Sequence, residues 1–447
     1  MKKQHTPRKF TRRDFLKLTG QGALLGLLGS TVRNYANAAA PGRHERSLAR
    51  ALARPAAAPG PGDLVMRLVA TDNEGVLLPN RADPLYVFGF RQVRLSDLTA
   101  PAATLPDPIG LETEAAAGSA PIDDLDVLKG QVQWPSPVIG VNQGQALYLT
   151  LTNIGFVGRP DLDDSHTIHW HGFRNPVSLF DGVPEVSIAV PPGRDFPYFY
   201  RPEHPGTYMY HCHFEDSEHV QMGMDGIVFV RPSQNGNTTY YPSGQYAYND
   251  ADGSTGYDRE WTLLLNEVDQ RPHDNLIGVQ EFVWSDYKPQ YWIINGRAYP
   301  DTLKPNQDPS LPQQPLSSLI QINSGERGLL RLVNLGYEQH TMQMTGITMT
   351  VVGEDATHLR GPGGASLYYD TANVYIGPGE SRDVLFTAPT HSGGPGPDVY
   401  LLKNRNYHKL SNGGAVDPLT GLGGMVTEVR VYPVGTLGAQ TQPNQSY

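Results

Sequence analysis

The sequence predicts an all-β protein that is organised as two antiparallel β-barrels or sandwiches. Its 48 glycines and 38 prolines are spread along 447 residues without a period, and such punctuation favours short strands joined by turns over long helices. Many of the apolar runs between these residues alternate apolar and polar positions, as half-buried strands do. The chain is too long for one ordinary core and suits two domains of ~150–200 residues.

The predicted strands form two series that are separated by a polar boundary. In the first half they cover 64–70, 146–152, 196–200, 207–210 and 226–230. A Pro- and Asp-rich stretch at 100–135 is predicted to be a long surface excursion. Residues 231–258 are polar and rich in turn formers, so they mark the boundary. The second series covers 261–265, 291–294, 319–322, 328–333, 347–352, 381–387, 399–402 and 426–431. We therefore predict one domain at 63–235 and another at 256–435.

The N-terminus carries a predicted export signal. Arg12 and Arg13 form a twin-arginine motif, and a mildly apolar stretch at 22–32 and a small-residue cleavage site follow it. That stretch is well short of the ~18 residues that a membrane anchor needs. We interpret residues 1–38 as a twin-arginine signal peptide and the Ala-, Pro- and Gly-rich residues 39–62 as a flexible linker. The protein is expected to be exported in its folded state and to be periplasmic or secreted.

Charge and cysteine content narrow the classes of partner. The formal net charge is −10, and removal of residues 1–38, which hold eight basic residues and one acidic residue, takes it to −17. A nucleic-acid partner or an anionic membrane surface is therefore disfavoured. Cys212 is the only cysteine, so no intramolecular disulfide is possible even though the destination is oxidising. A lone cysteine in an exported protein is buried and inert, paired between chains, or bound to a ligand.

Two histidine-rich segments carry the candidate chemistry. One contains His166, His169 and His171, and the other contains His211, Cys212, His213, His219, Met222 and Met224. Side chains alternate between the two faces of a strand. If the two segments form neighbouring strands, one face offers four imidazoles, from His169, His171, His211 and His213. The opposite face offers Cys212 and His166, and His219 can fold back to it after a loop.

These two faces predict two metal sites. A thiolate, two imidazoles and a weak thioether are the ligands of a blue-copper electron-transfer site. Four facing imidazoles suit a second copper centre that could bind a small oxidant. Cys212 is peptide-bonded to His211 and His213, which makes a short connection between the two sites. Zinc is the alternative metal because Cys/His sets also bind it, but the methionine and the second histidine face favour copper.

The two halves share a short pattern that indicates a duplicated domain. Asn153-Ile154-Gly155 ends a predicted strand and precedes His166, and Asn334-Leu335-Gly336 ends another and precedes His340. One such match could arise by chance, but its position before a histidine in both halves favours a distant repeat.

At these residues the sequence resembles the multicopper oxidase superfamily, which includes laccases, bilirubin oxidases and copper nitrite reductases. The similarity extends to 134–141 and to the Pro-Gly-Thr-Tyr-Met-Tyr segment at 205–210. The resemblance implies two cupredoxin-like domains, which are Greek-key β-barrels, with copper as the cofactor. The loop from Cys212 to His219 is longer than the one in typical laccases.

The resemblance also implies a role for each ligand. For type 1 copper, the matching positions are His166 and His219 for the imidazoles, Cys212 for the thiolate and Met224 for the axial thioether, with Met222 as the competing choice. For the second centre, His169 matches a type 2 copper ligand, and His171, His211 and His213 match type 3 ligands.

The second half departs from the family pattern. Where further copper ligands would stand, the sequence has Gln343 and Thr345 after His340, and Lys403-Asn404-Arg405 in place of a His-x-His. His340 and His408 could contribute, but each alone is expected to be structural. We therefore describe 256–435 as a cupredoxin domain with degenerate ligand motifs.

Three functions follow from this pattern. The leading hypothesis is a laccase-like multicopper oxidase, in which type 1 copper accepts single electrons from a small-molecule or protein donor and a second copper centre reduces dioxygen. The resemblance implies a possible homotrimer with that centre at the subunit interface. The alternatives are an enzyme similar to copper nitrite reductase, which would reduce nitrite, and a non-enzymatic type 1 copper electron-transfer protein. His169 and Thr345 both depart from the nitrite reductase pattern.

Overall fold

The structure is a computed structural model that describes residues 62–94, 109–110, 122–175 and 177–447. The predicted signal peptide and all but the last residue of the predicted linker lie outside the described residues. Residues 61–447 form one compact unit. Its described part is dominated by strands, so the all-β prediction is confirmed.

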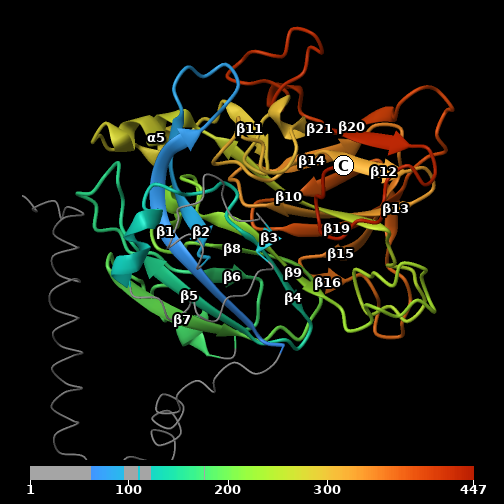
Figure 1. Ribbon diagram of the computed structural model, residues 1–447, viewed down its shortest axis with the longest axis horizontal. Helices are drawn as coiled ribbons and strands as arrows, with labels where there is room; N and C mark the ends of the chain where they lie inside the picture. Colours follow the sequence, from blue (N-terminus) through green and yellow to red (C-terminus); the bar gives the residue numbers. More distant parts are fainter. Residues whose placement is uncertain (1–61, 95–108, 111–121, 176) are drawn as a thin grey trace, which may run out of the picture. The chain divides into compact units, whose positions relative to one another are not determined.

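The first half of the compact unit contains two sheets (Figure 1). One has the order β2-β1-β5-β7, with β1 Leu64–Val76, β2 Leu85–Gln92, β5 Leu147–Asn153 and β7 Arg194–Tyr200. The other has the order β3-β4-β9-β8-β6, with β3 Ile109–Gly110, β4 Val138–Asn142, β6 His169–His171, β8 Gly206–His211 and β9 Asp225–Arg231. In β5, Leu147, Leu149 and Leu151 are buried, whereas Tyr148 and Thr150 between them are half-buried. This alternation is the pattern that predicted the strand.

The second half repeats this plan. One sheet runs β11-β10-β13-β19-β15-β16 with β17 paired to β15, and its strands are β10 Arg259–Val268, β11 Tyr291–Ile294, β13 Arg327–Asn334, β15 Met349–Glu354, β16 Thr357–His358, β17 Tyr369–Thr371 and β19 Ser381–Thr387. The other runs β12-β21-β20-β14-β18, with β12 Ile320–Asn323, β14 His340–Met344, β18 Asn373–Ile376, β20 Asp398–Asn404 and β21 Val426–Tyr432. In both halves the first strand pairs in parallel with a later one, β1 with β5 and β10 with β13.

Helices are short and lie in connections. The described ones are α4 Asp216–His219, α5 Gln270–Ile277, η2 Ile122–Leu128, η3 Ser178–Phe180, η4 Trp284–Asp286, η5 Asp301–Leu303 and η6 Tyr407–Lys409. The sequence patterns predicted none of them. The helix α5 packs against β2, where the ring of His273 hydrogen-bonds the Tyr86 carbonyl at 2.6 Å.

One fold prediction is wrong in its described part. The predicted surface excursion at 100–135 turns inward from Ile122 onward. Leu125 and Leu128 pack on Val69, Val93 and Ile154, and the buried Trp134 indole N–H donates to Asp225 at 2.9 Å. The Pro- and Asp-rich composition of this stretch suggested an exposed loop. Leu125 and Leu128 are buried nevertheless, because distant strands supply their packing partners.

The two halves meet across a buried charged network. Arg331 on β13 lies 2.9 Å from Glu260 on β10 and 3.5 Å from Asp383 on β19, and all three side chains are at most 4% exposed. Asp383 also accepts hydrogen bonds from Thr207 of the first half at 2.5 Å and from Tyr248 at 2.6 Å. The network therefore ties β8 to the second half.

We expect Arg331→Met to lower the free energy of unfolding by about 3–5 kcal/mol, because it leaves Asp383 buried without its cation and leaves Glu260 with Arg231 alone. Chemical denaturation measures the effect. Lys129→Met is the matched control, since Lys129 pairs with Asp126 on the surface, with side chains 35% and 59% exposed, and such pairs contribute about 0–1 kcal/mol. Equal losses in the two variants would contradict this account.

Candidate copper centres

The candidate site is organised by the pairing of two short strands. β6 and β8 are antiparallel, with His169 opposite His211, Trp170 opposite Tyr210 and His171 opposite Met209. Trp170 is fully buried and stacks on Tyr200, with ring centroids 4.0 Å apart. The indole therefore fixes one face of β6 in the core, and alternation turns His169 and His171 to the other face.

The structure brings Cys212, His166 and His219 together on the core side. The Cys212 Sγ lies 3.3 Å from His219 Nδ1 and 3.9 Å from His166 Nδ1. All three side chains are fully buried. The Thr167 backbone N–H points at the same sulfur from 3.4 Å. Strand parity predicted this grouping, and potential ligand atoms of the three residues lie within 4.8 Å of one another.

Backbone hydrogen bonds shape the loop that returns His219 to the sulfur. His219 ends α4, and its carbonyl accepts from the Met224 N–H at 3.0 Å. The Met224 carbonyl accepts in turn from the Cys212 N–H at 3.1 Å. Met222 and Met224 are both fully buried in the hydrophobic cluster that contains Cys212. Met224 is thus hydrogen-bonded through its backbone to both His219 and Cys212, and its choice over Met222 as the axial ligand stays a prediction.

The second face holds the four imidazoles. His169, His171 and His211 offer nitrogens within 4.8 Å of one another, and His171 Nδ1 lies 3.4 Å from His211 Nε2. The ring of His213 lies 5.1 Å from that of His169 and 5.6 Å from that of His211. The structure therefore gathers the predicted residues of the second site, with His213 at the edge.

Hydrogen bonds and burial prepare these rings to bind a metal. The Nδ1 atoms of His169 and His211 are bonded to the carbonyls of Asp181 and Cys212, at 2.6 and 2.8 Å, which leaves Nε2 as the nitrogen of each ring that could bind an ion. Burial lowers the pKa of His211 to about 3 and also lowers the pKa values of His169 and His171. The rings are therefore neutral near pH 7, as metal ligation requires.

Two glycines allow close approaches to the imidazole face. Gly182 has φ +80°, and a Cβ there would lie 2.2 Å from the Ile168 carbonyl oxygen, just before His169. Gly379, in the second half, has φ +74°, and a Cβ there would lie 3.3 Å from His171 Nε2. Neither glycine is among the predicted site residues. The Asp-Gly pair at 181–182 and the Pro-Gly pair at 378–379 could have revealed both glycines as turn positions, whereas nothing local indicates that Gly379 lies beside His171.

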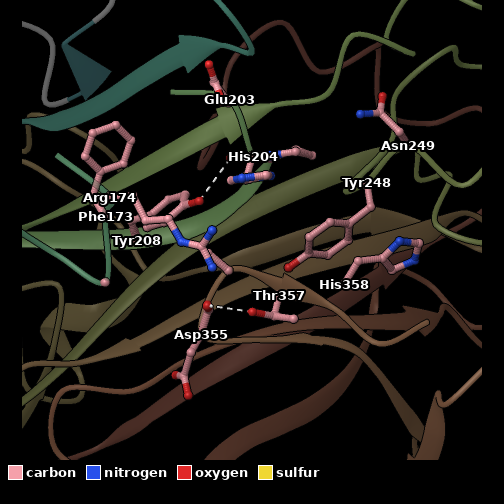
Figure 2. A pocket seen from close by; sticks show the side chains of 13 residues that line it. Phe173, Arg174, Glu203, His204, Tyr208, Tyr248, Asn249, Asp355, Thr357 and His358 are labelled. Carbon is pink, nitrogen blue, oxygen red and sulfur yellow. Dashed lines mark hydrogen bonds between the residues drawn. The ribbon is translucent and has the colours of Figure 1, made fainter. Parts of the chain in front are cut away.

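A cavity of about 580 Å³ lies beside the imidazole face, between the two halves. Its lining includes Gly172, the residue after His171, and the side chains of Arg174, Tyr208, Tyr248 and Asp355, which surround it in Figure 2. No sequence pattern indicated it, because its walls come from segments about 180 residues apart.

The residues fit copper at the thiol site. His166 and His219 both direct Nδ1 at the sulfur, and within the described chain their buried Nε2 atoms have no hydrogen-bond partner. A buried thiol, two imidazoles and nearby thioethers form the soft donor set that copper prefers. The imidazole face also suits copper, which imidazole binds well.

The second half adds no histidine to either group in the described structure. His340 is buried and its Nε2 lies 3.2 Å from Glu267 Oε2. His408 is exposed on η6, where its ring lies 5.3 Å from that of Trp292. Gln343 on β14 lies opposite Lys403 on β20. In the first half, the antiparallel pair of β6 and β8 carries imidazoles instead.

Fold and site together define a class: a two-part β-protein with a buried Cys-His-His group back to back with clustered imidazoles. Models of the multicopper oxidase family match residues 124–235 and 261–420. The chain belongs to the multicopper oxidase superfamily.

Comparison with known proteins gives distant relatives. Laccase-12 and Laccase-5 of Arabidopsis thaliana are 26% and 27% identical over 284 and 285 residues, or 62% of this chain. The matches span only 42% and 41% of those relatives, so the chain corresponds to less than half their length.

Among solved structures, a blue copper oxidase from Nitrosomonas europaea is similar with a TM-score of 0.56 and 20% identity, over 83% of this chain and 85% of that one. A copper nitrite reductase from the same organism gives 0.51 and 16%, over 86% and 97%. These similarities confirm the cupredoxin-like fold, and the family makes copper the expected metal. Among the described residues, no helix combines the length and apolar character needed to cross a membrane.

We expect Met224→Leu to change the copper spectrum and potential, because it removes the axial thioether that tunes a blue-copper site. Absorption spectroscopy and redox titration of the copper-loaded protein measure the change. Met222→Leu is the matched control, since Met222 is equally buried in the same cluster. The assignment of Met224 fails if Met222→Leu shifts the potential and Met224→Leu does not.

Proposed function

We propose that this chain is a copper-dependent oxidase, similar to laccases, that takes single electrons from a reducing donor and delivers them to dioxygen. One observation supports this most: Cys212 directs its sulfur to the thiol site while its neighbour His211 directs its ring to the imidazole face. The two sites are thus joined by one peptide bond at the end of β8.

The proposed ligands are divided between two centres. His166, Cys212, His219 and Met224 would hold type 1 copper, and His169, His171, His211 and His213 would hold the second centre. Copper, when bound, supplies one-electron redox chemistry at the first and reduction of dioxygen at the second.

The chain's own residues supply the connection between the centres. The His211 ring is bonded to the Cys212 carbonyl at 2.8 Å, which adds a contact to the covalent path. The Thr167 hydroxyl accepts from the His213 N–H at 2.9 Å, and its own N–H faces the sulfur. These bonds hold both histidines in fixed positions relative to Cys212.

The structure also supports separate access to each centre. A cavity of about 430 Å³ is lined by Arg159, Glu218, Leu276 and Phe282, beside His219. We propose it as the entry of a small-molecule electron donor or the contact of a protein donor. Asp164, 17% exposed, lies 3.8 Å from His219 Nε2 and leads toward that surface. The cavity of Figure 2 is the proposed entry of the oxidant on the other side.

A second candidate, a type 1 copper electron-transfer protein, is favoured by one observation. Gln343, Thr345, Lys403 and Arg405 occupy the second-half positions where the family implies further imidazoles. A nitrite reductase is a third candidate, because that fold also matches.

Assembly and location belong to the same proposal. Since the described second half brings no imidazole to His169, His171 and His211, further ligands would have to come from another copy, and we propose a homotrimer. We also propose export by the twin-arginine route, with the domains at 63–235 and 256–435. Analytical ultracentrifugation of the mature protein tests the trimer.

Copper counting and gas uptake test the function. We expect more than one copper per chain, both a blue and a type 2 paramagnetic signal, and dioxygen consumption with a phenolic donor. One copper per chain with only the blue signal would establish the electron-transfer alternative. Nitrite reduction without dioxygen uptake would establish the nitrite reductase alternative.

We expect His169→Ala to abolish dioxygen uptake while the blue absorption persists, because it removes a ligand from the imidazole face only. Oxygen-electrode assays and absorption spectra of the same sample measure the two effects. His204→Ala is the matched control: His204 is an exposed histidine that lines the cavity of Figure 2 and lies outside both ligand groups. Unchanged uptake in His169→Ala would contradict the proposed second centre.

A further inference from the structure

The internal repeat is preserved in the hydrogen bonds around the first candidate ligand. In the first half, Asn153 Nδ2 donates to the carbonyls of Asp164 and Val190, and Val190 bridges to His166. In the second half, Asn334 Nδ2 donates to the carbonyls of Glu338 and Ile376, and Ile376 pairs with His340. His340 therefore occupies the position of His166.

The same kind of comparison places the other three positions. The Cys212 N–H donates to the Met224 carbonyl at 3.1 Å, and the Asn404 N–H donates to the Met425 carbonyl at 3.0 Å. The Met224 N–H donates to the His219 carbonyl at 3.0 Å, and the Met425 N–H donates to the Lys409 carbonyl at 3.0 Å. The set His166, Cys212, His219 and Met224 thus corresponds to His340, Asn404, Lys409 and Met425.

In the second set, the polar side chains contact one another. His340 Nδ1, the atom that faces the sulfur in the first half, lies 3.1 Å from Asn404 Nδ2 and 3.5 Å from Lys409 Nζ. Asn404 Nδ2 also lies 3.3 Å from the Met425 sulfur. Two donors therefore approach the one nitrogen that could ligate a metal, and an amide stands where the first half has a thiol.

The charges in this set are also compensated. Lys409 is 3% exposed, and its Nζ lies 2.7 Å from Glu338 Oε2 and donates to the Gln339 carbonyl at 2.8 Å. Because His340 Nδ1 accepts, its Nε2 carries the proton and donates to Glu267 at 3.2 Å. A buried ammonium needs such partners, because its desolvation without them is strongly unfavourable.

We infer that His340, Asn404, Lys409 and Met425 are the second domain's counterpart of the copper site, and that the Lys409 ammonium takes the place of the metal ion. The inference rests on the proposed copper ligands of the first half. It limits the chain to one blue copper. By the same correspondence, Met224 and not Met222 matches Met425, whose sulfur lies next to Asn404, the counterpart of Cys212.

The decisive experiment rebuilds the second site. In full-length protein with Cys212→Ser, which removes the first thiolate, Asn404→Cys together with Lys409→His should restore an intense thiolate-to-copper absorption on addition of Cu²⁺. Asn404→Cys alone, with the ammonium retained, and Lys409→His alone, with no thiol, are the matched controls and should stay colourless. A folded protein that carries all three substitutions without the absorption would overturn the inference.

A stability measurement covers the case in which that variant does not fold. Lys409→Met in the otherwise unchanged chain should lower the Tm, because Glu338 loses its cation, and adding Glu338→Gln should recover part of the loss. An unchanged Tm in Lys409→Met would also overturn the inference. The blue absorption of the unsubstituted protein tests the proposed copper ligands of the first half separately. Failure of those ligands can therefore be distinguished from failure of the inference about the second half.

Discussion

The pairing of β6 with β8 is the contact on which the rest of the site depends. With His169 opposite His211, a slip of β6 by one residue would turn His169 and His171 toward the core and Trp170 out of it. The buried Trp170, stacked on Tyr200, opposes such a shift because it would have to leave the core. β8 is held in turn by β9 and, through Thr207, by the charged network of the second half.

Burial acts in opposite ways in the two halves. In the first half it lowers the pKa values of His169, His171 and His211, which keeps these three rings neutral near pH 7, and backbone carbonyls orient two of them. In the second half the same framework encloses Lys409 and satisfies His340 from both sides. One backbone plan thus serves as a metal site or as a closed polar core, and two side chains, Asn404 for Cys212 and Lys409 for His219, make the difference.

Much of the fold and site could be predicted from local patterns. Leu147, Leu149 and Leu151 showed the alternation of a half-buried strand, and the spacing of His169, His171, His211 and Cys212 assigned them to two faces. The repeat before His166 and His340 was also visible. The inward course of 122–135 and the helix α5 were not, because both are stabilised by partners far away in sequence.

The donor set follows from local sequence alone. One cysteine, the histidines and two methionines at fixed spacings admit few chemistries, and strand alternation needs no tertiary information. Which of these groups meet depends on the three-dimensional fold. It brought His219 to 3.3 Å from the sulfur and Gly379 close to His171, and it put Lys409 against His340. Those contacts join segments separated by loops, whose closure depends on packing and buried charge pairs across the whole chain and not on any local pattern.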